Sequence, residues 1–475
     1  MLFPTFDFAI FFGVVYVGAW ALNRRAVAWK LFMVAASYFF YAWWDWRFCG
    51  LLLAATVITH FGATGIHASA SERARRWWLI GALVGLLGVL GYFKYYGFFA
   101  VNVDNMLHAA GLGRLVPLLT PTLPIAISFF TFMAISYVVD VYRRTFEPAT
   151  PIDLAVYLSF FPHLVAGPIV RGSELLPQIR RPRDPHQVDL ARASVLIMGG
   201  LFKKVVISSY VASAIVDPVF ASPRTHSAPE VLFAVWGFAV QIYADFSGYT
   251  DIAIGVALLL GVRFPVNFDA PYTARDLQEF WRRWHITLSR WLRDYLYIPL
   301  GGNRGSQLAT SRNLLVTMIL GGLWHGANWT FLAWGALHGV GQVVGHHRRL
   351  YRERRGLPPL AGTLDAKVRQ RFLTFQFVCL GWLFFRASSM SNAFAMLSQL
   401  CTGWRVPSTL VTPLLVLVLA GMIAAQYVPA NFVDRGVTWF RRLAAPWQAL
   451  ALGSALLVTT TLGPTGVSPF IYYRF

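Results

Sequence analysis

Two histidines, His285 and His325, are the residues whose type and setting point most clearly to chemistry. His325 lies in the stretch GGLWHGANWTFLAWGALHG, where glycines on both sides allow another backbone or a ligand to approach closely. A buried neutral imidazole can accept a proton from a hydroxyl group, and its pKa is close enough to working pH for general-base catalysis. A lone histidine in a membrane span is more often structural, but the glycines and the second histidine favour catalysis here. His338, in the same stretch, is interpreted as structural or substrate-lining.

His285 lies in the segment 275–312, which combines an apolar and a polar helical face. Aromatic and aliphatic residues recur there at helical spacing: Phe280, Trp284, Leu288, Trp291 and Tyr295. His285, Ser289 and Arg293 follow one another at intervals of four residues and form an adjacent polar stripe. One interpretation is an amphipathic helix at the cytoplasmic interface, with arginines extended toward water and tryptophans as anchors. Such a helix has no need of an imidazole, so His285 is also a catalytic candidate.

A second group of polar residues lies in the motif QIYADFSGYTD, within or at the end of an apolar run. Ionisable groups in a span are costly and are therefore functional candidates, which applies to Asp245 and to its neighbour Ser247. Asp245 and Tyr249 are one helical turn apart, however, and a structural polar network between them is slightly favoured. The three cysteines are scattered without CxxC spacing, so no metal site is predicted.

The elements that must position these residues are predicted to be membrane-spanning helices. Apolar residues make up 56% of the 475 residues and charged residues only 13%, whereas a soluble domain carries about a quarter charged residues. This composition disfavours a secreted enzyme, a disordered scaffold and a cytosolic domain. A span needs about 20 mostly apolar residues. About ten are predicted: 3–22, 31–46, 48–66, 77–98, 119–142, 192–218, 229–260, 372–388, 409–428 and 445–463.

The distribution of charge predicts how these spans are oriented. Lysine and arginine exceed aspartate and glutamate by 41 − 21 = 20, and they form short clusters between apolar runs. This pattern is typical of cytoplasmic loops in a lipid bilayer, so no nucleic-acid partner is predicted. With the N-terminus outside, every basic cluster is cytoplasmic and the tail 464–475 lies on the outer face. The chain 1–475 is therefore expected to be a single multi-pass membrane domain.

Two apolar segments are expected to enter the membrane without making simple crossings. Residues 151–170 are interrupted by Pro162 and Gly167-Pro168, and residues 313–345 are interrupted by glycines and are too short for two spans. Both are predicted to be re-entrant or broken helices, with His325 near the tip of the second. Such backbone is tolerated at membrane depth only where it is buried in protein or lines a wet cavity. The segments therefore predict a functional cavity.

Several of these stretches together resemble the bacterial, polysaccharide-modifying branch of the membrane-bound O-acyltransferase (MBOAT) family, and are most similar to its alginate O-acetyltransferase membrane subunits. The resemblance extends from about residue 120 to the C-terminus. Its blocks are LPIAISFFTFMAISYVVDVYRR, FFPHLVAGPIVRGSELLPQI, QIYADFSGYTDIAIG, NFDAPYTARDLQEFWRRWHITLSRWLRDYLYIPLGGNR and GLWHGANWTFLAWGALHG. It implies a helical bundle with re-entrant helices and a central tunnel, in which a cytoplasmic thioester and an outer acceptor meet.

The resemblance also implies roles for particular residues. The near-invariant histidine of the family's WHG motif matches His325, which would assist proton removal from the accepting hydroxyl. The WHxS/T motif matches His285, which would orient the thioester or the acceptor. Acetyl-CoA is implied as the donor substrate, with no permanently bound cofactor. The candidates for lining the tunnel or contacting substrate are Trp324, Asn328, Ser289, Arg293, Asp245 and Ser247.

The C-terminal sequence PFIYYRF resembles a terminal motif of the same branch, whose tyrosine is proposed to carry the acyl group. Tyr472 matches that tyrosine, whereas Tyr473 and Arg474 depart from the commoner Phe-Gln. The alternative is that the tail is an aromatic anchor at the membrane interface. Members of the branch work with an extracytoplasmic SGNH-type acetyltransferase, so such a partner is implied here.

The sequence therefore predicts an O-acetyltransferase of the bacterial inner membrane that acts on an exopolysaccharide, most simply an alginate-like polymer. Other envelope polymers, cellulose or peptidoglycan, are alternative acceptors. Two further alternatives are a non-catalytic subunit for polysaccharide export and a family member with a longer acyl donor.

Overall fold

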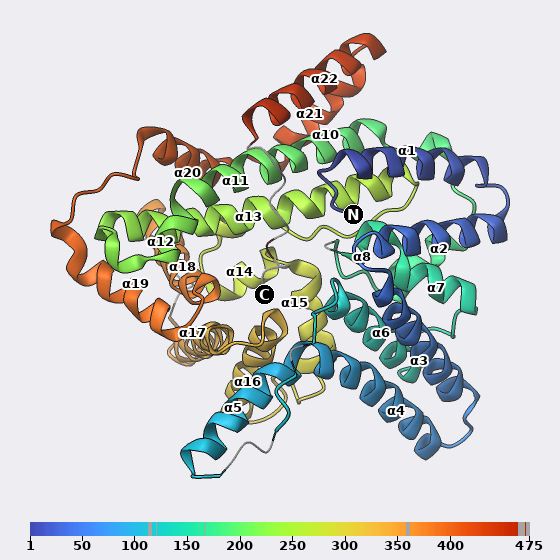
Figure 1. Ribbon diagram of the computed structural model, residues 1–475, viewed down its shortest axis with the longest axis horizontal. Helices are drawn as coiled ribbons and strands as arrows, with labels where there is room; N and C mark the ends of the chain where they lie inside the picture. The colour runs from blue at the N-terminus through green and yellow to red at the C-terminus, as the bar shows by residue number, and fades with distance from the viewer. Residues whose placement is uncertain (113–115, 120, 166, 358–361, 464–470, 472–475) are drawn as a thin grey trace. The chain divides into compact units, whose positions relative to one another are not determined.

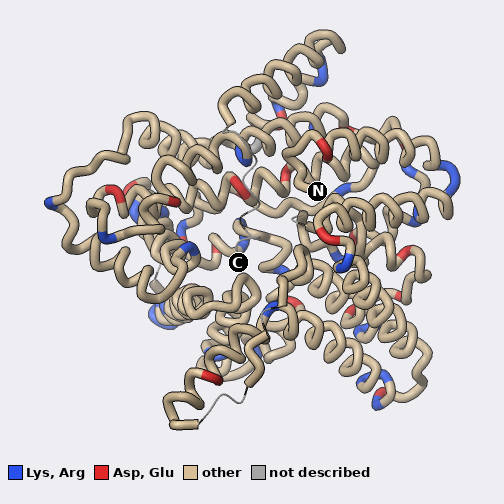
Figure 2. The backbone as a smooth tube through the Cα atoms, viewed as in Figure 1, with Lys and Arg blue, Asp and Glu red and all other residues tan. Residues whose placement is uncertain are grey.

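The computed structural model describes residues 1–112, 116–119, 121–165, 167–357, 362–463 and 471. These residues form helices, with no strand among them, and long stretches of helix carry no charged residue (Figure 2). Four helices in the described part of the chain are long and apolar enough to cross a membrane: Trp46–Ala68, Glu72–Ala109, Leu190–Ala221 and Ala228–Leu259. Shorter apolar helices are Phe6–Ala21, Ala26–Ala42, Ile127–Tyr142 and Pro413–Ala425. The predicted all-α polytopic fold is confirmed.

The chain divides into two compact units, and the first comprises Met1–Ala193 with Ala253–Pro265. Its helices are α1 (Phe6–Ala21), α2 (Ala26–Ala42), α3 (Cys49–Ala68), α4 (Glu72–Leu90), α5 (Tyr96–Ala109), α6 (Ile127–Tyr142), α7 (Pro151–Ser159), α8 (Phe161–Leu164) and α9 (Gly172–Ile179). Helices α3, α4 and α6 pack side by side (Figure 1). At Gly62 a Cβ atom would lie only 2.6 Å from the Cβ of Ala82, so the close approach of α3 and α4 requires a glycine.

The segment 151–170 is broken, as its prolines and glycine predict. Helix α7 ends at Ser159, Phe160 leaves the helical conformation, and α8 begins at Phe161 with Pro162 in its first turn. The Phe161 N–H, which the break deprives of a helical partner, donates to the Ser37 hydroxyl at 3.1 Å. The residues around the break are completely buried, which is the setting in which irregular backbone is tolerated inside a membrane protein.

The second unit comprises Ser194–Ile252 with Val266–Phe475. Its helices are α10 (Leu190–Leu201, which begins in the first unit), α11 (Ser209–Val211), α12 (Asp217–Ala221), α13 (Ala228–Leu259, which ends in the first unit), α14 (Leu277–Arg283), α15 (Ile286–Leu292), α16 (Gln307–His325), α17 (Trp329–Arg354), α18 (Leu364–Arg386), α19 (Met390–Thr402), α20 (Pro413–Ala425), α21 (Ala430–Arg442) and α22 (Ala445–Leu462). A helix or a run of helices underlies every predicted span. Helices α19 and α21 were not predicted, and the basic residues Arg441 and Arg442 lie on α21 rather than in a loop.

Two glycines bring the segment after α10 against α13. A Cβ on Gly200 would lie 2.5 Å from the Gly248 carbonyl oxygen, and a Cβ on Gly248 would lie 2.7 Å from the Gly200 carbonyl oxygen. The backbone that follows Gly200 is π-helical over Phe202–Ser208. This close contact places two consecutive lysines of the π segment, Lys203 and Lys204, opposite acidic residues of α13.

The continuous helix predicted around His285 is instead divided in two. Helix α14 ends at Arg283, His285 adopts a left-handed conformation (φ 41°), and α15 begins at Ile286. Asn267 stabilises the break, because its backbone carbonyl accepts from the Ile286 N–H at 2.9 Å. Its side-chain oxygen accepts from the Thr287 N–H at 3.2 Å. The break divides the predicted apolar face between Phe280 and Leu288. His285 is the N-cap residue of α15, and its carbonyl accepts from the Ser289 N–H at 3.0 Å.

Helices α16 and α17 form a hairpin around the predicted turn (Figure 1). The glycines allow the two helices to touch: a Cβ on Gly335 would lie 2.5 Å from the Met318 carbonyl oxygen. His325 is the last residue of α16, and the chain turns over Gly326 to Asn328 before α17 begins. His325 therefore lies where the chain turns back from α16 into α17, and its depth in a membrane stays a prediction.

Candidate active site

His325 is held at the hairpin turn by aromatic rings. Its imidazole lies 4.9 Å from the Trp324 ring, 5.1 Å from the Trp334 ring and 5.2 Å from the Phe385 ring, measured between ring centroids. All three contacts are edge-to-face or nearly so, and His325 is only 3% exposed. These ring contacts fix the position of the imidazole, whose neutral form is the one that accepts a proton.

The turn that follows His325 needs a small residue. The Phe331 ring packs directly on Gly326, and any Cβ at position 326 would overlap that ring. Asn328 then begins α17 by accepting a hydrogen bond from the Thr330 N–H at 3.1 Å through its side-chain oxygen. Its side-chain nitrogen donates to the Ser388 carbonyl at 3.3 Å. The sequence Gly326-Ala327-Asn328 therefore fixes the end of α16, and with it the position of His325.

His285 is fully buried and its ring orientation is set by Asn267. The Nδ1 atom of His285 lies 3.2 Å from the Asn267 side-chain oxygen, which also accepts from the Thr287 hydroxyl at 2.9 Å. Because that oxygen only accepts, Nδ1 carries the proton, and the lone pair of the neutral ring is on Nε2. Nε2 has no hydrogen-bond partner among the described residues.

Trp324 connects the two histidines. Its ring lies 6.2 Å from the His285 ring and 4.9 Å from the His325 ring. Phe246 of α13 packs edge-on against the other side of His285 at 4.7 Å. The structure thus brings His285, Trp324 and His325 into one aromatic cluster, although 40 residues separate the two histidines in the sequence.

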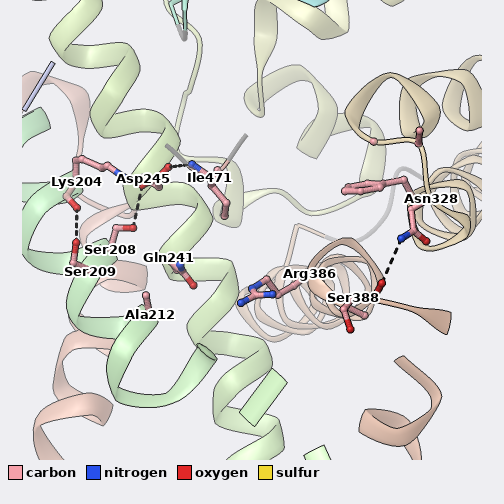
Figure 3. A pocket seen from close by; sticks show the side chains of 14 residues that line it. Lys204, Ser208, Ser209, Ala212, Gln241, Asp245, Asn328, Arg386, Ser388 and Ile471 are labelled. Atoms are coloured by element: carbon pink, nitrogen blue, oxygen red, sulfur yellow. Dashed lines mark hydrogen bonds and ion pairs between the residues drawn. The ribbon is translucent and has the colours of Figure 1, made fainter. Parts of the chain in front are cut away.

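A cavity of about 390 Å³ adjoins this cluster (Figure 3). The turn residues Gly326, Ala327 and Asn328 form one wall, so the cavity reaches the residue next to His325. The rest of the wall combines hydroxyl, amide and charged groups with four apolar side chains: Lys204, Ser208, Ser209, Ala212, Gln241, Asp245, Phe331, Arg386, Ala387, Ser388 and Ile471. A cavity with these polar groups can hydrogen-bond a hydroxyl-rich acceptor next to the turn that carries His325.

Comparisons with known proteins show the family of this chain. Residues 122–353 match the membrane-bound O-acyltransferase family. The chain is 41% identical over 404 residues to a probable alginate O-acetylase of Pseudomonas aeruginosa, which covers 83% of this chain and 74% of the relative. The chain belongs to the membrane-bound O-acyltransferase family. This MBOAT chain is also 35% identical over 508 residues to a probable alginate O-acetylase of Pseudomonas putida, with both chains covered completely. It is 38% identical over 425 residues to a peptidoglycan O-acetyltransferase of Helicobacter pylori, covering 83% of this chain and 78% of the relative.

Family membership establishes that the MBOAT chain is an acyltransferase and a multi-pass membrane protein. The predicted non-catalytic alternative is thereby set aside. The histidines of the two motifs, His325 of WHG and His285 of WHxS/T, lie in the aromatic cluster beside the cavity.

The other predicted site residues of the MBOAT chain divide into two groups. Asp245 and Asn328 line the cavity, and Trp324 packs between the histidines. Ser247 is buried and accepts a hydrogen bond from Lys203 Nζ at 3.0 Å, outside the cavity wall. Neither Ser289 nor Arg293 is in that wall, and Arg293 pairs with Asp294 at 2.6 Å with most of its side chain exposed. Tyr472 lies outside the described residues.

Sequence reasoning missed several cationic and amide residues of the MBOAT site. Lys204 pairs with Asp245, and Ser208 donates to the same carboxylate oxygen at 3.3 Å. Arg386, in the cavity wall, pairs with Asp217 at 2.7 Å. Two consecutive lysines within the predicted span 192–218 were a signal, because charged residues in a span normally have a partner. Asn267 carried no comparable signal, since it lies in a loop 18 residues before His285.

Proposed function

We propose that this MBOAT protein moves acetyl groups from cytoplasmic acetyl-CoA across a bacterial inner membrane for O-acetylation of an exopolysaccharide, alginate-like in composition. The names of the relatives, alginate O-acetylases and a peptidoglycan O-acetyltransferase, support acetyl transfer to a polysaccharide. The observation that carries the proposal is the placement of His325 at a hairpin turn whose next three residues line a polar cavity.

The chemistry is the transfer of an acyl group from a thioester to a hydroxyl. The imidazole of His325 takes the hydroxyl proton while the oxygen attacks the thioester carbonyl carbon. The carbon–sulfur bond then breaks, and the departing thiolate takes the proton back from the imidazolium, so that ester and free thiol are the products. His285 contributes through Nε2, whose lone pair is fixed by the Nδ1 contact to Asn267, by orienting the donor or the acceptor.

A second cavity, of about 340 Å³, supports the choice of donor. Its wall carries four arginines and a single acidic residue, together with apolar side chains. The arginines are Arg275, Arg348, Arg349 and Arg352. Guanidinium groups bind phosphates well, and coenzyme A carries several phosphate groups next to its thioester arm. Three of these arginines belong to the basic block 346–355, which the positive-inside rule assigns to the cytoplasmic side.

Helix α17 connects the two cavities. Its N-terminal residues Asn328 and Phe331 line the polar cavity, and its later residues from Val340 to Arg352 line the basic one. Twenty residues of α-helix, from Asn328 to Arg348, span roughly 30 Å, the thickness of a bilayer core. A continuous series of rings leads from the basic cavity to His325. Phe377 in its wall lies 6.0 Å from His338, His338 lies 4.9 Å from Trp334, and Trp334 lies 5.1 Å from His325.

Delivery to the polymer would require further components. We infer that an extracytoplasmic SGNH-type acetyltransferase completes the transfer, and that Tyr472 near the C-terminus carries the acetyl group to it. An acetyl ester on a phenol is activated toward attack by a second hydroxyl, so this second transfer needs no further source of energy. Peptidoglycan is the second candidate acceptor, because the Helicobacter pylori relative acts on it by name at 38% identity.

Purified protein reconstituted in lipid tests the donor and the acceptor separately. Release of free coenzyme A is followed with acetyl-CoA or palmitoyl-CoA, and with oligosaccharides of alginate, cellulose or peptidoglycan. We expect release from acetyl-CoA to exceed release from palmitoyl-CoA at least tenfold and to be stimulated by uronate oligosaccharides. Faster turnover of palmitoyl-CoA would contradict the proposed donor, and stimulation by peptidoglycan fragments alone would replace the proposed acceptor.

A further inference from the structure

Asp245 makes two different kinds of contact with its two carboxylate oxygens. Oδ1 pairs with the ammonium group of Lys204 and accepts from the Ser208 hydroxyl at 3.3 Å. Oδ2 accepts a hydrogen bond from the backbone N–H of Ile471 at 3.0 Å, across 226 residues of sequence (Figure 3). Ile471 is only 5% exposed and lines the same cavity as Asn328.

We propose that the Lys204–Asp245 pair is the docking point that holds the C-terminal segment of this chain in the cavity beside His325. Asp245 is in this view a positioning residue, not a catalytic one. The inference deepens the proposed function, because it assigns to that cavity an occupant from the chain's own C-terminus.

The burial of this ion pair favours a role beyond stability. The Lys204 and Asp245 side chains are 2% and 3% exposed. A buried ion pair contributes little net stability compared with apolar residues of similar size, because both charges lose their hydration. A carboxylate that is oriented by Lys204 and partly faces a cavity is, however, a strong acceptor for a backbone N–H. The pair therefore provides what a docking point for a peptide chain requires.

A neighbouring ion pair on the same two elements provides an internal comparison. Lys203 pairs with Asp251 and donates to the Ser247 hydroxyl at 3.0 Å. It joins the π segment to α13 as the Lys204 pair does, but neither Lys203 nor Asp251 lines the cavity that Ile471 lines. If both pairs served only to join the two elements, they would be equivalent, and removing either would affect the position of Ile471 equally.

Recognition through a backbone N–H fixes the register of the docked segment. The hydrogen bond does not depend on the Ile471 side chain, so a conservative change of that side chain preserves it. A proline at this position has no N–H to donate and removes the bond, while the Lys204–Asp245 pair stays intact. These two substitutions separate docking from the stability of the ion pair.

Hydrogen–deuterium exchange at the Ile471 amide, measured without donor or acceptor, tests the docking directly. We expect slow exchange in the unsubstituted protein and in the control Lys203→Met/Asp251→Leu. We expect exchange at least tenfold faster in Lys204→Met/Asp245→Leu, whose apolar pair leaves no orphan charge. Fast exchange in the unsubstituted protein, or equal exchange in both double variants, would overturn the proposal.

Two single substitutions keep the proposal testable if the double variant does not fold. We expect Ile471→Pro to lower acetyl transfer at least tenfold and Ile471→Val to lower it less than twofold. Equal activity of the two variants would overturn the docking role. The variant His325→Ala distinguishes the two proposals. It should abolish acetyl transfer while the Ile471 amide stays protected from exchange. Loss of the chemistry and loss of docking therefore give different results.

Discussion

The Nδ1 atom of His285 lies 3.2 Å from the side-chain oxygen of Asn267, and this contact determines which face of the imidazole is available. The same oxygen accepts from the backbone of Thr287, so the amide cannot exchange its oxygen and nitrogen without losing that bond. Asn267 consequently fixes both the backbone break before α15 and the tautomer of His285. The lone pair on Nε2 follows from these contacts.

Removal of this acceptor should lower activity without abolishing it. In Asn267→Ala the His285 ring loses its orienting partner, and we expect kcat to fall roughly tenfold, about 1.4 kcal/mol. Asn267→Asp retains an oxygen acceptor and is the matched comparison, with activity expected above that of Asn267→Ala. Steady-state release of coenzyme A measures both. Equal activity in all three proteins would show that the contact has no part in catalysis.

Gly326 should be sensitive to the addition of one methyl group. A Cβ there overlaps the Phe331 ring, so Gly326→Ala must displace either the ring or the turn after His325. We expect a loss of about 1–3 kcal/mol in stability, typical of overpacking, together with a large fall in activity. Thermal unfolding in detergent and coenzyme A release are the measurements.

Two further variants check the cause of that loss. Phe331→Leu in the Gly326→Ala background should recover part of the activity by making room for the methyl group. Gly453→Ala in α22, where a Cβ meets nothing within 4 Å, should leave stability and activity close to those of the unsubstituted protein. If Gly453→Ala lowers stability and activity as much as Gly326→Ala, then the replacement of a glycine, rather than the clash at the turn, explains the result.

The arginine-lined cavity should distinguish donors by their phosphates. We expect the unsubstituted protein to prefer acetyl-CoA over acetyl-pantetheine, which lacks the nucleotide. In Arg348→Gln/Arg349→Gln the KM for acetyl-CoA should rise about tenfold, with little change for acetyl-pantetheine. Arg441→Gln/Arg442→Gln on α21 is a control of equal charge change. If both pairs raise KM equally, a general effect of surface charge is responsible.

Much of the helical framework could be predicted from the sequence, because spans are set by the length of apolar runs. The turn after His325 could be predicted because glycines interrupt the apolar run on both sides of it. The break at His285 could not be predicted. The apolar spacing from Phe280 to Tyr295 continues across it, whereas its cause is Asn267, which lies in a different part of the sequence. The contact of Asp245 with Ile471 could not be predicted either, because the two residues meet only through tertiary packing.

The tyrosine relay predicts a covalent intermediate at one of two adjacent tyrosines. With labelled acetyl-CoA, we expect label on the C-terminal peptide of the unsubstituted protein and of Tyr473→Phe, but not of Tyr472→Phe. Peptide mass spectrometry after brief incubation measures it, and an ester on a phenol is identified by its release in hydroxylamine. Unchanged polymer acetylation in Tyr472→Phe would remove the relay from the mechanism and leave direct transfer.

The imidazole of His325 is the centre of the account, and the most direct measurement compares it with His338. Both histidines are buried in the α16–α17 hairpin and both pack against Trp334, so their replacement by glutamine disturbs similar surroundings. Acetyl transfer is measured for His325→Gln and His338→Gln at equal amounts of folded protein in the membrane. We expect a loss of at least a thousandfold for His325→Gln and less than tenfold for His338→Gln. Retention of transfer by His325→Gln would contradict it.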